Sequence, residues 1–302
     1  MPMVYWLTRH LVFTVIFYDA DPANSFALRQ AARILVQQLG ELMETLVAGI
    51  KFKEHGPFDR VIDLFHKPHS KISIYGQHMI QQLLKSGLGA KDIIWSNILP
   101  TAGGMIANQA QLFAQCLDFY LSEEAAPHLK EINRLAKLDT PEADDLLLRY
   151  FMEGARIRST VGLYRLATED TTIKDGEKVV NIKAGEVVLC DLVTASEDPA
   201  TFPDPYQVKL DRPMDSYIHF GWGRHTCLGL DMTKLALTTM LKTVGKLDNL
   251  RRAPGDQGHI KKIAGPGGIT LYMTVDHSSL FPFPTTMKVR WDGELPAAAS
   301  QQ

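Results

Sequence analysis

Apolar residues recur every three or four positions over much of this chain, which is the spacing of one face of a helix. The pattern predicts helices at Ala23–Phe52, Gly76–Ser86, Asp92–Ser122, Ala125–Leu138, Pro141–Ser159 and Cys227–Leu247. Pro100 and the pair Gly103-Gly104 fall inside the third of these ranges. Proline and glycine distort a helix locally, so we expect an irregular stretch there.

A second pattern, of short β-branched runs, occupies Val161–Val193 and is broken by Asp175-Gly176 and Ala184-Gly185. Such interruptions are typical of hairpins. Val187–Cys190 predicts a short apolar strand, and Leu250–Arg290 predicts loops and a β-hairpin. The chain is therefore expected to be mainly α with small β-sheets.

Composition changes this picture little. Hydrophobic residues make up 45% and charged residues 22%, as in an ordinary globular domain, and a net charge of −2 gives no sign of nucleic-acid binding. We expect one domain over 1–292 and a disordered tail over 293–302. Three widely spaced cysteines make a poor disulfide framework and predict a reducing compartment, hence the cytoplasm, with Cys116 and Cys190 in the core.

The N-terminal apolar run Leu11–Tyr18 is too short to span a bilayer. No basic region precedes it and Asp19 follows at once, so a signal peptide is not indicated. We predict a buried helix or strand there and no transmembrane segment.

One cysteine lies among glycines in the run Phe220-Gly221-Trp222-Gly223-Arg224-His225-Thr226-Cys227-Leu228-Gly229. Glycines let the backbone approach a flat ligand closely. The predicted helix places Cys227 at a helix N-terminus, where free N–H groups and the positive dipole end favour a thiolate. Cys227 is therefore a candidate axial ligand for haem iron. The alternative for a lone cysteine is an inert, buried residue in a turn.

A carboxylate and a guanidinium, Glu153 and Arg156, are neighbours on one face of the predicted helix Pro141–Ser159. Most pairs of this kind are solvated and contribute little. Thr201-Phe202-Pro203-Asp204-Pro205 and then Arg212 lie between this pair and the cysteine loop.

The pattern F-x-x-G-x-H-x-C-x-G resembles the cysteine-ligand loop of the cytochrome P-450 family. The usual loop has arginine two residues before the cysteine, where this chain has His225, with Arg224 one step earlier. The resemblance implies a haem bound through Cys227, and cofactor contacts from the loop residues Phe220, Gly223, Arg224, His225 and Gly229.

The same resemblance covers the two signals upstream of the loop. Glu153-Gly154-Ala155-Arg156 is similar to the E-x-x-R motif of the family, and the segment ending at Arg212 is similar to its meander. The resemblance implies that Glu153, Arg156 and Arg212 form a structural cluster that locks the core behind the haem.

Asn108 and Gln109 lie within the predicted helix Asp92–Ser122. O2-activating members of the family usually carry an acidic residue and a threonine at the corresponding place. An amide cannot supply a titratable proton, but it can hydrogen-bond and orient a peroxide. On these residues alone, the favoured explanation is two polar side chains that face solvent or another helix.

The run Ala102–Gln109 resembles the distal helix of the fungal linoleate diol synthases, also called psi-factor-producing oxygenases. Asp21–Ala32, Leu250–Gly255 and Phe281–Val289 are similar to the same family. In that family a haem dioxygenase domain makes a fatty-acid hydroperoxide, and a C-terminal cytochrome P-450 domain isomerises it to a dihydroxy fatty acid. Asn108 and Gln109 match the amides that assist this step.

The resemblance thus implies a fatty-acid hydroperoxide isomerase of oxylipin biosynthesis, with haem as its cofactor and a dioxygenase domain as partner. It also implies that the chain is the C-terminal two-thirds of a cytochrome P-450 domain that begins earlier. Two alternatives stay open: a monooxygenase that needs O2 and a reductase, and a non-catalytic remnant. Peripheral contact with a membrane or lipid body also stays open, because the implied substrates are fatty acids.

Overall fold

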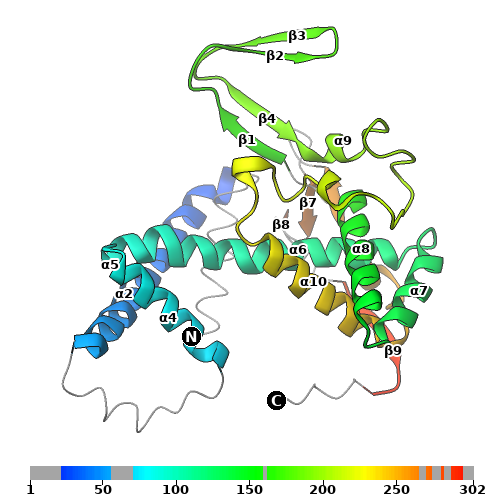
Figure 1. Cartoon of the computed structure of the whole chain (residues 1–302), viewed down its shortest axis with the longest axis horizontal. Helices are drawn as coiled ribbons and strands as arrows, with labels where there is room; N and C mark the ends of the chain where they lie inside the picture. Colours follow the sequence, from blue (N-terminus) through cyan, green and yellow to red (C-terminus); the bar gives the residue numbers. More distant parts are fainter. Residues whose placement is uncertain are drawn as a thin grey trace. The chain divides into compact units, whose positions relative to one another are not determined.

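The computed structural model describes residues 22–55, 71–158, 162–264, 270–273, 280–281 and 287–294 (Figure 1). The chain divides into two compact units, Met1–Asn108 and Gln109–Gln302. The predicted apolar segment Leu11–Tyr18 and most of the predicted tail 293–302 lie outside the described residues. The single domain predicted over 1–292 stays a prediction.

The first unit contains α2 (Pro22–His55), α4 (Lys71–Lys85), α5 (Ala90–Asp92), a π-helix (Ile93–Ile98) and the start of α6 (Leu99–Tyr120). Ile93 and Ile94 are fully buried, and α2 contacts both α4 and the π-helix. An irregular stretch is found just upstream of the predicted place, as this π-helix, in which Leu99 N–H bonds to the carbonyl of Ile94, while Pro100, Gly103 and Gly104 themselves lie in α6. The π-helix lies just before Pro100, whose nitrogen has no hydrogen to donate to a regular helical turn.

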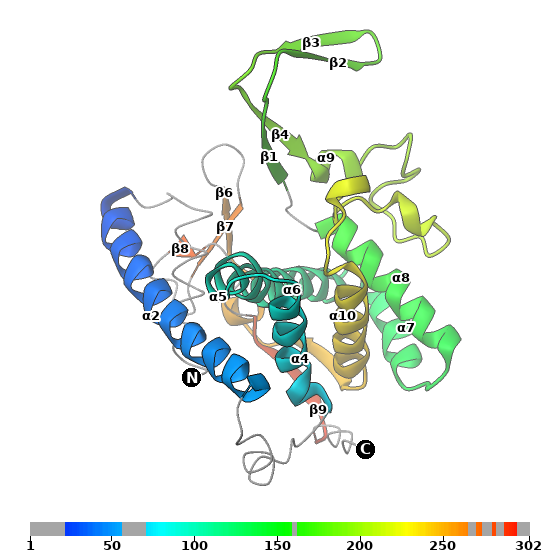
Figure 2. The same ribbon diagram turned by 60° about the vertical axis from the view of Figure 1, so that its left-hand side comes forward.

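The second unit builds its core from the C-terminal part of α6 and from α7 (Ala126–Ala136), α8 (Pro141–Arg158) and α10 (Leu230–Gly245). The last three helices lie side by side in both Figure 1 and Figure 2. Their shared interior is apolar because each presents one stripe of large side chains to the others. Its fully buried members include Tyr120, Ile132, Leu147, Phe151 and Leu237.

Two glycines set how closely these helices approach. A Cβ atom on Gly154 of α8 would lie 2.6 Å from Cys116 Sγ and 2.7 Å from a ring carbon of Tyr120, both on α6. A Cβ on Gly245 of α10 would lie 2.8 Å from Ala136 Cβ on α7. No side chain fits in either gap, so these glycines permit contacts that alanine would prevent.

Antiparallel ribbons connect α8 to the segment before α10. β1 (Gly162–Leu166) pairs with β4 (Val187–Asp191), and β2 (Thr171–Asp175) pairs with β3 (Lys178–Ile182). The β2–β3 hairpin continues outward from the end of the β1–β4 ribbon (Figure 1). The strand predicted at Val187–Cys190 is thus found, and a short helix, α9 (Leu192–Ser196), follows it.

The C-terminal region forms two further small sheets. β5 (Asp248–Arg252) pairs with β9 (Val289–Asp292). β6 (Lys262–Ala264), β7 (Thr270–Met273) and β8 (Leu280–Phe281) form a three-stranded sheet. The β6–β7 pair is the kind of hairpin that the sequence predicts here.

Two sequence-based expectations need correction. The helix predicted from Cys227 begins at Leu230, because Gly223–His225 forms a 3₁₀ turn and Cys227 N–H bonds to Phe220 instead of to a helical turn. Cys190 is exposed and not in the core, since β4 pairs only with β1 in the described part of the chain. Cys116 is fully buried, as expected. No helix in the described ranges has the length and apolar character needed to cross a membrane.

Candidate cysteine-ligand site

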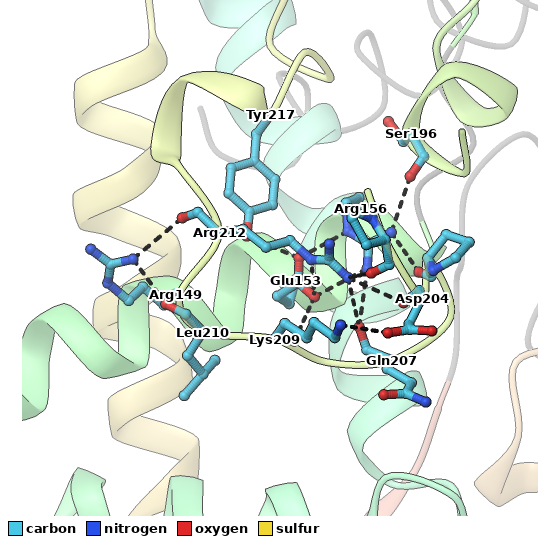
Figure 3. Close-up of polar contacts among 12 residues, drawn as sticks. Arg149, Glu153, Arg156, Ser196, Asp204, Gln207, Lys209, Leu210, Arg212 and Tyr217 are labelled. Atoms are coloured by element: carbon cyan, nitrogen blue, oxygen red, sulfur yellow. Dashed lines mark hydrogen bonds and ion pairs between the residues drawn. The ribbon is translucent and has the colours of Figure 1, made fainter. Parts of the chain in front are cut away.

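The structure brings Glu153, Arg156 and Arg212 together around one buried carboxylate (Figure 3). Arg156 makes a bidentate contact with it, donating from Nε to Oε1 at 2.8 Å and from Nη2 to Oε2 at 3.0 Å. Arg212 Nε and the Lys209 main-chain N–H donate to Oε2 at 3.3 and 2.9 Å. Tyr217 OH donates to Oε1 at 2.9 Å. Glu153 is thus saturated with donors.

These donors decide the charge of the carboxylate. Burial alone would raise the pKa of Glu153, but hydrogen bonds from Arg156, Lys209 N–H and Tyr217, together with the Arg156 charge, hold the pKa below its usual value. Glu153 is therefore ionised at neutral pH. With two guanidiniums against one carboxylate, the cluster carries one excess positive charge.

Main-chain carbonyls accept further hydrogen bonds from both guanidiniums. They come from the last residue of α9 and from the irregular segment that follows it. Arg156 donates to the carbonyls of Ser196, Pro205 and Gln207 at 3.0, 2.6 and 3.3 Å, and Arg212 donates to those of Pro203, Asp204 and Gln207 at 3.0, 3.1 and 3.4 Å. The Phe202 ring lies 5.0 and 5.6 Å from the two guanidinium carbons, within cation–π range. The cluster thus fixes this segment to α8.

Two residues between this cluster and the cysteine loop were not anticipated. Tyr217 is the fourth side chain on the carboxylate cluster, and burial followed by the Glu153 charge raises the pKa of its phenol. His219 is buried, and burial followed by the Arg156 charge lowers the pKa of its imidazole to about 4. The signal that could have indicated them is the alternation of ring side chains just before the glycine-rich run.

The cysteine loop folds back on itself. Cys227 N–H donates to the carbonyl of Phe220 at 2.8 Å, and Cys227 carbonyl accepts from Leu230 N–H at 3.1 Å. Gly221 has φ +81°, and a Cβ there would lie 2.3 Å from the carbonyl oxygen of His225. Only glycine fits that position. The fold therefore fixes the backbone of Cys227 at both of its hydrogen-bonding groups.

The thiol of Cys227 is exposed, whereas the main-chain groups of this residue are held by these hydrogen bonds. Cys227 is a free, exposed cysteine three residues before α10, whose first N–H groups have no side-chain cap. A helix N-terminus stabilises a thiolate through these N–H groups and the dipole. Trp222 and Leu228 are exposed apolar side chains of the same loop. Arg224 and His225 are exposed as well.

These residues fit a haem. A soft sulfur donor suits iron, exposed apolar side chains suit a porphyrin face, and Arg224 and His225 can meet its carboxylates. Phe220 is half-buried and packs on the core, and Gly229 lies next to Cys227, with its Cβ position 3.8 Å from Sγ. Every loop residue predicted to contact the cofactor thus lies in one short, internally bonded turn.

The two predicted amides differ in setting. Gln109 of α6 is partly buried and donates from Nε2 to Thr233 Oγ1 on α10 at 3.4 Å. This contact ties it to the helix that follows Cys227. Asn108 is exposed and is the last residue of the first unit. Because successive residues of a helix diverge by about 100°, the two amides do not point the same way.

Comparison with known proteins defines the class. Residues 145–269 match the family model described as "Cytochrome P450". P450BioI, solved in complex with a hexadec-9Z-enoic acid ligated acyl carrier protein, aligns with a TM-score of 0.65 at 21% identity over 96% of this chain and 62% of its own. Cytochrome P450 CREJ aligns with a TM-score of 0.66 at 18% identity over 96% and 61%. The fold is that of a cytochrome P450, as the motifs predict.

Proteins similar in sequence give a more specific comparison than the fold does. Psi-producing oxygenase A of Aspergillus fumigatus is 59% identical over 95% of this chain. A bifunctional dioxygenase (DOX)-epoxy alcohol synthase (EAS) of Fusarium oxysporum is 46% identical over 93%, and a 7,8-linoleate diol synthase of Pyricularia oryzae is 32% identical over 93%. The chain spans 26%, 22% and 30% of these relatives. It is related to the linoleate diol synthases, which confirms the predicted resemblance.

Proposed function

We propose that this chain is the haem-thiolate part of a longer fatty-acid oxygenase, and that it isomerises fatty-acid hydroperoxides to dihydroxy fatty acids. The observation that carries the proposal is the free, exposed thiol of Cys227, a residue whose main-chain N–H and carbonyl are both held by hydrogen bonds. The names of the relatives, psi-producing oxygenase and linoleate diol synthase, support the substrate class.

The residues of the chain have separate tasks in this proposal. Cys227 binds iron as a thiolate, and the N-terminus of α10 stabilises the negative charge on sulfur. Arg224 and His225 hold the carboxylates of the haem. A bound haem supplies the redox-active iron at which the O–O bond of a hydroperoxide is cleaved.

The amides of Asn108 and Gln109 orient the hydroperoxide by hydrogen bonding. Neither amide titrates near neutral pH, so they hold the substrate oxygens without delivering a proton from an acid. A hydroperoxide already contains both oxygens, and the reaction needs neither NADPH nor a reductase. The partner is a dioxygenase domain that makes the hydroperoxide. The relatives extend well beyond the matched region, which supports such a domain.

A cytoplasmic location is part of the proposal, because Cys227 must stay reduced to ligate iron. The cytoplasm keeps free thiols reduced. Contact with a lipid body or a membrane surface would bring the chain to fatty-acid substrates.

The ligand is tested by the carbon monoxide difference spectrum of the reduced protein, expressed with ample haem supply. The wild type is expected to show the band of thiolate-ligated iron. Cys227→Ala should lose this band, and Cys190→Ala is the matched control because Cys190 is also a free, exposed thiol. A thiolate band that survives Cys227→Ala would overturn the ligand assignment. A wild type without a haem band would favour the non-catalytic remnant.

The reaction is tested by supplying a linoleic acid hydroperoxide without any reductant. Conversion to a dihydroxy acid supports the isomerase. An epoxy alcohol as the only product would assign the chemistry named for the Fusarium relative. Turnover of free linoleic acid that depends on NADPH, O2 and a reductase would favour the monooxygenase instead.

A further inference from the structure

Two buried ring side chains, Tyr217 and His219, lie on the stretch that leads from the Glu153 cluster to the cysteine loop. Burial alternates along this stretch, with Tyr217 and His219 buried and Ile218 and Phe220 half-buried. The backbone is extended at Tyr217 and turns at His219 and Phe220, where Gly221 N–H bonds to the carbonyl of Ile218. Both rings are buried and therefore face the interior of the second unit.

Tyr217 is joined to the buried Glu153 carboxylate, which several other groups also hold. Its hydroxyl donates to Glu153 Oε1 at 2.9 Å, and its ring lies 6.0 Å from the ring of Phe202. Glu153 cannot shift to follow Tyr217, because Arg156 and Arg212 hold the same carboxylate from α8 and from the irregular segment. The hydroxyl is thus anchored to a fixed point.

A series of ring contacts leads from Tyr217 to Phe220, whose carbonyl is hydrogen-bonded to Cys227. The rings of Tyr217 and His219 meet edge to face at 6.0 Å, and those of His219 and Phe220 lie 4.5 Å apart. The carbonyl of Phe220 accepts the N–H of Cys227. Neither ring nitrogen of His219 has a hydrogen-bond partner among the described protein groups, so the imidazole acts through its ring contacts.

We propose that Tyr217 and His219 are positioning residues, which transmit the fixed place of Glu153 to the main chain of Cys227. The inference rests on the proposed function, since the position of Cys227 matters most when its sulfur ligates haem iron. The two rings decide how rigidly the cysteine loop is held, and thereby how long the thiolate stays on iron.

Tyr217→Phe tests this by removing one oxygen and keeping the ring. Tyr206→Phe is the matched control: Tyr206 lies on the same irregular segment, is exposed, and donates to Glu197 at 3.3 Å. The first readout is amide hydrogen exchange of the haem-free protein. We expect the Cys227 amide to exchange about tenfold faster in Tyr217→Phe, as for loss of one charge-assisted hydrogen bond, with no change in Tyr206→Phe.

The second readout is the haem-bound protein. Tyr217→Phe should lower the proportion of thiolate-ligated iron in the carbon monoxide spectrum and speed haem transfer to an acceptor globin, while Tyr206→Phe resembles the wild type. A purely structural role would lower the melting temperature but leave both loop exchange and ligation unchanged. His219→Phe keeps an aromatic ring between Tyr217 and Phe220 and should keep loop protection. His219→Ala should lose it, and provides the test if Tyr217→Phe does not fold.

The proposed function and the proposed positioning role can be refuted by different results. If the wild type binds no haem, the proposed function fails, and hydrogen exchange still decides the positioning role. If the Cys227 amide exchanges equally in Tyr217→Phe and Tyr206→Phe, and His219→Ala also leaves it protected, the positioning role is wrong.

Discussion

Replacing Glu153 by glutamine changes one oxygen to an NH2 group and removes one negative charge from a fully buried site. Two donors meet Oε1 and three meet Oε2 in the native cluster. Whichever way the amide is turned, at least two donors then face an NH2 group. The guanidiniums of Arg156 and Arg212 also lose the carboxylate with which both of them pair.

The expected cost follows from these contacts. Removing one partner of a buried ion pair destabilises a protein by about 3–5 kcal/mol, because it leaves uncompensated charge in the interior. Native proteins are stable by only about 5–15 kcal/mol. Glu153→Gln should therefore lose a large part of the free energy of unfolding of the second unit.

The matched control is Glu131→Gln. Glu131 pairs with Arg134 at the same i, i+3 spacing and with the same bidentate contacts, at 2.9 and 2.7 Å, but both side chains are exposed. An exposed pair contributes about 0–1 kcal/mol. Urea unfolding followed by circular dichroism gives both free energies from one experiment. The chemical change and the helical geometry are the same, so the difference reports burial together with the additional donors that Glu153 has.

The pH dependence of the free energy of unfolding gives an independent test of the charge on Glu153. The pKa of Glu153 is lowered in the folded state, so the unfolded state takes up its proton first as the pH falls. The contribution of Glu153 to stability is thus complete above about pH 4.5 and is lost as the pH falls through the lower, folded pKa. Glu153→Gln should lack this acid-linked loss. A variant that loses under about 1 kcal/mol at pH 7, no more than Glu131→Gln, would refute the reasoning.

Two further outcomes follow from packing and from burial of an imidazole. Gly154→Ala should destabilise the protein by about 1–3 kcal/mol, because its Cβ would overlap Cys116 and Tyr120, whereas Gly104→Ala, with open space around Cβ, should be neutral or stabilising in urea unfolding. The pKa of His219 is held at about 4 against an ordinary 6.5, so its contribution is complete above about pH 6.5 and is lost as the pH falls toward 4. His219→Phe should remove this slope, worth up to about 3 kcal/mol, and an unchanged slope would contradict the burial argument.

The sequence predicts most helices well because their apolar faces repeat over several turns. Pro141–Ser159 is found at Pro141–Arg158 and Ala125–Leu138 at Ala126–Ala136. The prediction fails for the start of α10, since helix-forming residues continue back to Cys227 while the backbone is held by the hydrogen bond to Phe220. A local pattern contains no information about that bond.

Some residues of the candidate site can likewise be predicted from local spacing, and others cannot. The i, i+3 spacing of Glu153 and Arg156 is enough to make them neighbours. Arg212 comes from an irregular segment, where no periodic rule applies, and it could be assigned only through the family resemblance. For Tyr217 the alternation of ring side chains indicates burial at most, because nothing in the sequence says that a carboxylate faces its hydroxyl. The roles of Asn108 and Gln109 stay predictions.

The guanidiniums of Arg156 and Arg212 grip the stretch from Ser196 to Gln207 by its peptide oxygens. Because these hydrogen bonds use main-chain oxygens, they depend little on the exposed side chains. Tyr206 and its exposed neighbours can therefore be substituted without loss of the hydrogen bonds that hold this stretch. The same stretch is accordingly a sound place to attach a fluorophore or a surface tether, where a flexible loop would blur the signal.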